Sequence, residues 1–217
     1  MSNIQNRLQK AARYHQKGKL DVAMPIYREI LQKEPENGEA RYLLGTLYLQ
    51  PGKLDIAEEM LVKATRLLPH LQEAFSNLGI LYMSKSDLEK AESYLLKAFQ
   101  LKPDALDLLM NLGNLYLAKN DLAGSREFYE KARNVDTTNP GPMLGIGNVL
   151  LKEDKLDEAE SMYKQILEKQ SRIPEVYFNL GIIERTRENA DTARQYFKTA
   201  LELRPGYAEA EQAMAAL

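Results

Sequence analysis

The stretch NLGILY at Asn77–Tyr82 returns as NLGNLY at Asn111–Tyr116, 34 residues further along the chain. Looser copies occur at the same spacing, as LLGTLY at Leu43–Tyr48, GIGNVL at Gly145–Leu150 and NLGIIE at Asn179–Glu184. A fixed period of this length indicates one supersecondary unit stacked on copies of itself. The repeat therefore decides the architecture of the 217-residue chain, and it directs the search for function to an extended surface.

Six repeats without insertions can be counted from residue 4, and a partial seventh covers residues 208–217. Within each repeat the apolar residues have helical spacing, and a short polar turn separates two helical stretches. We read no strands, so the sequence predicts an all-α chain with a single domain over residues 1–217. The repeats lie at residues 4–37, 38–71, 72–105, 106–139, 140–173 and 174–207, and residues 208–217 are expected to form a capping helix.

Three repeat positions predict how the helices pack. The eighth residue is glycine in five repeats, although glycine inside a helix costs about 1 kcal/mol relative to alanine. The twentieth residue is always alanine or serine, and the twenty-fourth is always tyrosine, leucine or phenylalanine. We expect the small residues at positions 8 and 20 to bring the two helices of a repeat together, and position 24 to fill the next layer. Ser86, followed by Glu89, is expected to open a second helix as a capping box.

These repeated glycine, alanine, aromatic and proline positions resemble the tetratricopeptide repeat family, a 34-residue helix-turn-helix unit. The resemblance covers residues 4 to about 217. It implies a right-handed α-solenoid whose first helices line a concave groove. In such proteins the groove holds an extended peptide or a partner helix, so we expect a protein-interaction module or scaffold.

Asparagines at repeat positions that the resemblance places in the groove are the first candidate binding residues. A carboxamide offers both a donor and an acceptor, so it can pair with a peptide backbone whatever the peptide's side chains are. The alternative is that asparagine is the family's general consensus there, without a role in binding. Leu43 and Gly145 interrupt the series. The candidates are Asn77, Asn111, Asn114, Asn148 and Asn179.

Apolar side chains at repeat positions 5 and 12 supply the second set of candidates. They predict a groove with an apolar middle and polar ends, suited to an amphipathic helix or a hydrophobic peptide. The alternative is that these side chains pack between neighbouring first helices. The candidates for apolar contact are Tyr42, Met83, Met110 and Leu117.

Catalysis, cofactors and metal ions find little support in the sequence. The chain has no cysteine, its two histidines lie in different repeats, and no phosphate-binding loop or catalytic motif appears. We therefore predict a non-enzymatic protein without a cofactor or metal. A formal charge of −2, without a basic run, gives no sign of nucleic acid as a partner. The absence of a signal peptide or an 18-residue apolar segment predicts a cytoplasmic protein without membrane insertion.

One interpretation of the capping segment is a short cap that suffices, and two further hypotheses stay open. Ala213, Met214, Ala216 and Leu217 predict a thin apolar outer face, although a solenoid needs a polar cap for solubility. One explanation is a chain that continues past Leu217, which would make the repeats the substrate-recruiting module of a larger enzyme, for example a glycosyltransferase or sulfotransferase. The other is self-association through the exposed end, which would give a homo-oligomeric scaffold.

Overall fold

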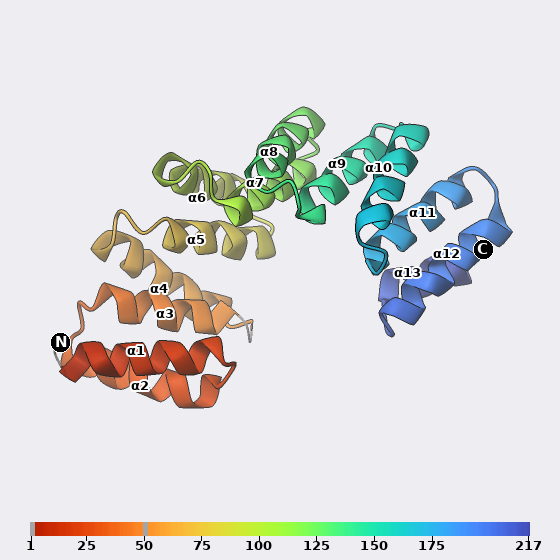
Figure 1. Cartoon of the computed structure of the whole chain (residues 1–217). Coiled ribbons are helices and arrows are strands. Elements are labelled where there is room, and N and C mark those ends of the chain that lie inside the picture. Colours follow the sequence, from red (N-terminus) through yellow and green to blue (C-terminus); the bar gives the residue numbers. More distant parts are fainter. Residues whose placement is uncertain (1–2, 50–51) are drawn as a thin grey trace. The chain divides into compact units, whose positions relative to one another are not determined.

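The structure is a computed structural model, and residues 3–49 and 52–217 are described. Thirteen helices and no strand occur in these two ranges (Figure 1). They form two compact units, an N-terminal unit of Met1–Asn111 and a C-terminal unit of Leu112–Leu217, each described by itself below. The helices are α1 (Asn3–Gln16), α2 (Leu20–Lys33), α3 (Gly38–Leu49), α4 (Leu54–Leu67), α5 (Gln72–Ser84), α6 (Leu88–Leu101), α7 (Leu106–Ala118), α8 (Leu122–Val135), α9 (Pro140–Lys152), α10 (Leu156–Lys169), α11 (Pro174–Thr186), α12 (Ala190–Leu203) and α13 (Ala208–Ala215).

The helices alternate in phase with the sequence repeat. From α3 to α13 each first helix begins at the first residue of its repeat, and every second helix from α2 to α12 has 14 residues. Helix pairs such as α3–α4, α5–α6 and α11–α12 pack against each other. The predicted all-α solenoid fold of tandem helix-turn-helix repeats is confirmed.

The turn inside each repeat depends on one residue with left-handed backbone conformation. It is the fifteenth residue of the repeat, and its φ is between +60° and +72° in all six copies: Gly18, Gly52, Ser86, Asn120, Asp154 and Glu188. Only the first two are glycines, for which this conformation has no steric cost. Because Ser86 occupies this turn, the predicted capping box is wrong, and the Asp87 side chain caps α6 by accepting from the Lys90 amide.

The core repeats the same contact in each helix pair. Residues at positions 20, 24 and 27 of the repeat, such as Ser125, Tyr129 and Ala132, are buried in all six copies. The glycine at position 8 makes room for the large side chain at position 24 of its own repeat. A Cβ atom added at Gly113 would lie 2.4 Å from the Tyr129 ring. The residue at position 24 thus fills the space beside the first helix of its own repeat, in addition to its expected place against the next one.

Tyr129 also explains why one predicted asparagine position holds glycine. A Cβ atom added at Gly145, in the following repeat, would lie 2.6 Å from the same ring. The tyrosine thus occupies a space bounded by Gly113 and Gly145. Glycine therefore replaces asparagine at this position because a larger side chain would collide with the Tyr129 ring.

Charged pairs connect consecutive helix pairs within each unit. In the N-terminal unit, Lys85 donates to Glu58 at 2.6 Å and to Asp55 at 2.7 Å. In the C-terminal unit, Arg187 donates to Glu160 at 2.6 Å from the equivalent repeat position. Each cation is residue 14 of its repeat, and each glutamate is residue 21 of the preceding one.

The last helix covers the apolar end of the sixth helix pair. Ala213 is buried with Ala193 and Phe197, and Met214 and Leu217 pack against this cluster. The expected apolar outer face is therefore wrong, because three of its four residues point inward. The exposed residues of α13 include Glu209, Glu211 and Gln212, so the outer face of the cap has polar side chains.

Candidate functional site

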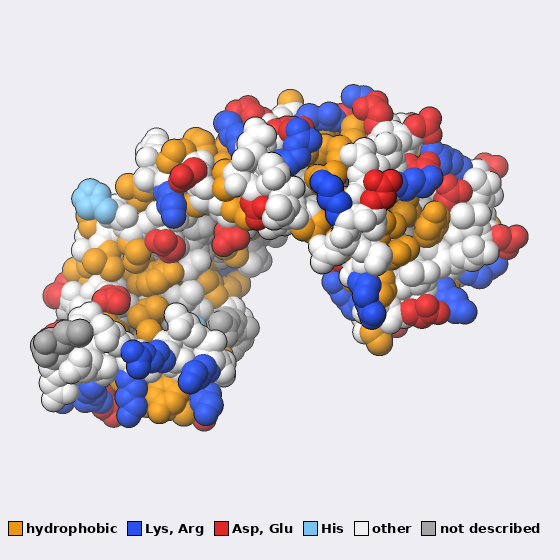
Figure 2. Space-filling view, viewed as in Figure 1, with side chains coloured by type: hydrophobic (Ala, Val, Ile, Leu, Met, Phe, Trp, Pro, Cys, Tyr) orange, Lys and Arg blue, Asp and Glu red, His pale blue; other side chains and the backbone are white. Residues whose placement is uncertain are grey.

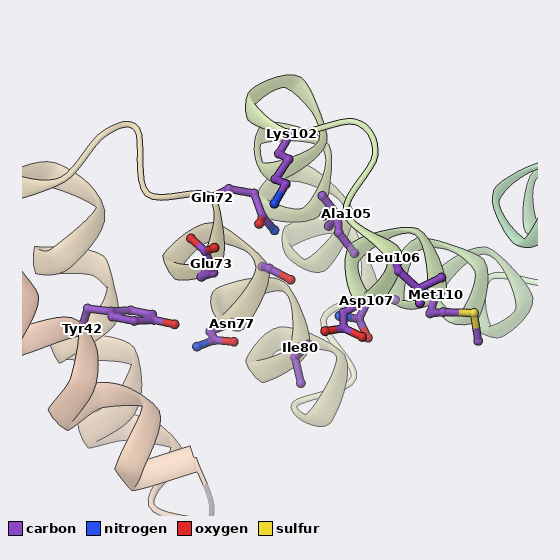
Figure 3. A pocket seen from close by; sticks show the side chains of 13 residues that line it. Tyr42, Gln72, Glu73, Asn77, Ile80, Lys102, Ala105, Leu106, Asp107 and Met110 are labelled. Atoms are coloured by element: carbon purple, nitrogen blue, oxygen red, sulfur yellow. The ribbon is translucent and has the colours of Figure 1, made fainter. Parts of the chain in front are cut away.

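A hollow of about 660 Å³ opens on the N-terminal unit between consecutive first helices. Its walls come from α3, α5, the α6–α7 turn and the start of α7 (Figure 3). Because the helices repeat in phase, residues at equivalent repeat positions enter it from successive helices. Thirteen residues line it: Tyr42, Gln72, Glu73, Ser76, Asn77, Ile80, Lys102, Ala105, Leu106, Asp107, Leu108, Met110 and Asn111.

Four of the nine residues predicted from the sequence lie together in this hollow. They are Tyr42, Asn77, Met110 and Asn111, each of them half-buried. Figure 3 shows the Tyr42 ring extending from α3 toward Asn77 on α5. Burial, followed by the negative charge of Glu73, raises the pKa of Tyr42, while hydrogen bonding with Thr46 and Asn77 opposes this rise. These four residues thus bring an aromatic ring, a thioether and two carboxamides into the hollow.

Three other predicted asparagines lie in the C-terminal unit and make internal hydrogen bonds. The Tyr129 hydroxyl donates to the Asn114 side-chain oxygen at 2.6 Å. The Tyr163 hydroxyl donates to the Asn148 side-chain oxygen at 2.8 Å, and the Asn179 amide donates to the same oxygen at 2.7 Å. Each of the three therefore has a hydrogen-bond partner inside the protein, and its part in binding stays a prediction.

The remaining two predicted residues, Met83 and Leu117, are half-buried on α5 and α7. Neither lines the hollow. Half-burial agrees with either of the two roles considered for the apolar positions, exposure in a groove or packing between first helices. Their part in binding stays a prediction.

Two functional candidates escaped the sequence reasoning. Gln72 and Ser76 line the hollow and are only 8% and 7% exposed. The sequence does distinguish Ser76, because it is the only polar residue at repeat position 5, where the other repeats have leucine, tyrosine, methionine or phenylalanine. The sequence does not distinguish Gln72, because the first residue of the repeat is apolar in some repeats, and glycine, glutamine or proline in others.

The charged side chains of the hollow are two carboxylates and one ammonium group. Glu73 and Asp107 are second residues of their repeats, and Lys102 begins the turn after α6. All three are exposed, and none forms an ion pair with any of the described residues. Figure 2 shows hydrophobic side chains gathered over α3 and α5, with acidic side chains beside them.

Residues 3–49 and 52–217 contain neither a candidate metal-binding cluster nor a helix suited to span a membrane. No group of three or more histidine, cysteine, aspartate or glutamate side chains in these ranges could hold a metal ion. None of the helices described there has the length and apolar character needed to cross a bilayer.

Models of a known protein family match most of the chain. A model described as tetratricopeptide repeat matches residues 14–78, and a second with the same description matches residues 76–140 and 144–208. These ranges include well over half of the chain. No curated protein matches it in sequence.

Several solved structures share the fold over nearly the whole chain. PilF of Pseudomonas aeruginosa is 23% identical with a TM-score of 0.79, and the alignment covers 99% of this chain and 97% of PilF. PilW, a widely conserved type IV pilus biogenesis factor, is 16% identical with a TM-score of 0.84, over 99% of this chain and 100% of PilW. YrrB, a repeat protein with an unusual peptide-binding site, is 20% identical with a TM-score of 0.63, and the alignment covers 87% of this chain and 97% of YrrB. Identities this low establish likeness of fold alone.

Proposed function

The chain belongs to the tetratricopeptide repeat family, and we propose that it binds an extended peptide or a partner helix along its first helices. Repeats of this family form protein-interaction scaffolds. We take the groove on the N-terminal unit, between α3, α5 and α7, as the binding surface. YrrB, which shares the fold, is described as having a peptide-binding site, and this supports a peptide as the occupant.

The observation that carries the proposal is the meeting of four predicted residues in one hollow. Asn77 and Asn111 are sixth residues of consecutive repeats and line the same space. Two carboxamides presented in register can pair with backbone groups of an extended chain. Tyr42 and Met110 add half-buried apolar surface next to them, as peptide-binding grooves require.

We propose that the partner is a protein or peptide, and that the chain acts through binding without catalysis of its own. The cytoplasmic location and the homo-oligomer stay predictions. Sedimentation of the purified chain over a range of concentrations would test the second of these.

The test compares partner capture by the full-length chain and by the Asn77→Ala/Asn111→Ala double variant. We expect the double variant to lose most of the partner recovered by the wild type. Asn134→Ala is the matched control, because Asn134 is an exposed asparagine on the second helix α8. If a folded double variant, with circular dichroism identical to wild type, recovers as much partner as the wild type, the groove is not the binding surface.

A further inference from the structure

Three acidic side chains at the starts of first helices in the N-terminal unit have no ion-pair partner among the described residues. Glu39, Glu73 and Asp107 are the second residues of α3, α5 and α7, all exposed, and none forms an ion pair within the described ranges. In the C-terminal unit the equivalent Glu175 is paired with Arg204. Acids in the first turn of a helix are favoured by the helix dipole, so these carboxylates alone do not define a site.

Gln72 and Ser76 provide an independent sign of a ligand. Both side chains are more than nine-tenths buried, and both line the hollow beside Glu73. Neither forms a side-chain hydrogen bond with a described residue. The side-chain polar atoms of both residues keep access to the open space of the hollow, and Figure 3 shows the Gln72 side chain pointing into this space. A bound backbone or polar group would complete their hydrogen bonds.

The remaining lining residues suit the stem of a long cationic side chain. The Tyr42 ring, Ile80 and Met110 supply apolar surface in the same hollow. Lysine and arginine side chains lay their methylene stems along apolar surface while the charged head stays at a polar edge. An aromatic ring also attracts a nearby cation. Lys102 leaves the lining with an excess of one negative charge, so charge complementarity favours a basic occupant over an acidic one.

We propose that the hollow binds an extended peptide through a lysine or arginine side chain of that peptide. The cationic head lies between Glu73 and Asp107, and its stem contacts Ile80, whereas Tyr42 and Met110 contact neighbouring side chains of the peptide. Gln72 and Ser76 pair with the adjacent peptide backbone. This inference rests on the proposed function, because it names the chemical class of the peptide that the same groove holds.

The test uses four pools of fluorescein-labelled, acetylated and amidated nonapeptides that have uncharged residues around one fixed central residue. The fixed residue is lysine, arginine, glutamine or glutamate, and binding to the full-length chain is followed by fluorescence anisotropy at low ionic strength. We expect the lysine and arginine pools to bind at least about tenfold more tightly than the glutamate pool, with a preference that salt weakens.

Variants separate charge recognition from backbone recognition. Glu73→Gln/Asp107→Asn is expected to abolish the preference for the cationic pools, whereas Ser76→Ala is expected to weaken all pools equally. Glu175→Gln is the matched control, since it removes an acid from the same repeat position outside the hollow, and it should leave the binding of all four pools unchanged.

Two results would overturn the inference. If all four pools bind equally and the Asn77→Ala/Asn111→Ala variant loses them all, the groove binds peptides without selecting a cation, and the proposed function stands. If no pool binds, the inference also fails, and the partner-capture experiment with the asparagine variant decides the proposed function separately.

Discussion

Arg126 on α8 donates a hydrogen bond of 2.6 Å to Glu153 at the end of α9, and its charge is opposite to that of its equivalents. In the pairs Glu58–Lys85 and Glu160–Arg187, the residue at position 21 is the acid and the residue at position 14 of the next repeat is the base. This junction alone among the three has the signs exchanged. The ion pairs therefore distinguish one repeat junction from another, although the apolar packing is nearly the same.

A double-mutant cycle would measure this pair. Glu153→Arg places two cations in contact, and we expect a loss of about 1 kcal/mol in the free energy of unfolding, as for other partly exposed pairs. Adding Arg126→Glu restores opposite charges and should recover most of the loss. Urea unfolding at two salt concentrations provides the measurement. Additive effects of the two substitutions would show that the pair has no coupling energy.

Adding a methyl group at Gly113 should disturb the whole helix pair. The new Cβ atom would lie 2.4 Å from the Tyr129 ring, which Gly145 bounds on its other side. We expect Gly113→Ala to reduce the free energy of unfolding by about 1–3 kcal/mol, and Gly113→Leu to reduce it further. Chemical denaturation measures the change. In the Tyr129→Ala background the same Gly113→Ala substitution should be nearly neutral, and a full-sized loss there would contradict the steric explanation.

Two buried tyrosines should respond differently to loss of the hydroxyl. The Tyr163 hydroxyl donates to Asn148, whereas the fully buried Tyr27 hydroxyl has no partner in the described part of the chain. The reason is local, because the residue equivalent to Asn148 in the first repeat is Ala12. We expect Tyr163→Phe to cost about 1 kcal/mol and Tyr27→Phe to be neutral or stabilising. Thermal unfolding of both variants measures this, and equal losses would contradict it.

Replacing Glu188 should stabilise the turn between α11 and α12. Its φ of +64° lies in the left-handed region, which glycine adopts at the same repeat position in Gly18 and Gly52. Glu188→Gly should therefore raise the free energy of unfolding by up to about 1 kcal/mol. Asn120→Gly is the control, because asparagine tolerates this conformation better and should gain less. A destabilised Glu188→Gly protein in urea unfolding would refute the prediction.

Alkaline pH should weaken the core through its buried tyrosines. Burial raises the pKa of Tyr27 and of Tyr129 to about 12, from an ordinary value of 10. The unfolded chain ionises first, so the stability that these groups contribute is complete below pH 10 and is lost as the pH rises through 12. We expect a loss of the order of 2 kcal/mol per tyrosine over this range.

Urea unfolding across this pH range, with tyrosinate absorbance, measures the effect. Tyr129→Phe should show a smaller decline between pH 10 and 12 than the wild type. An identical decline in both proteins would assign the alkaline loss to other groups.

The sequence by itself determined the helix pairs and their order. Helical spacing, the 34-residue period and the recurring small and large residues are local or strictly periodic signals, so they predict the same geometry at every repeat. The pattern also led to Tyr42, Asn77, Met110 and Asn111, because equivalent repeat positions face the same way in consecutive helices.

Only the tertiary structure shows which partners the predicted asparagines have inside the protein. Asn114 and Asn148 are bonded by tyrosines 15 residues later, whose hydroxyls reach across to the first helix of the same repeat. The structure also placed Gln72 and Ser76 in the hollow with their side chains almost fully buried. Such contacts depend on side-chain length and on the exact approach of neighbouring helices. A periodic sequence pattern records neither, because it assigns the same environment to every copy of a position.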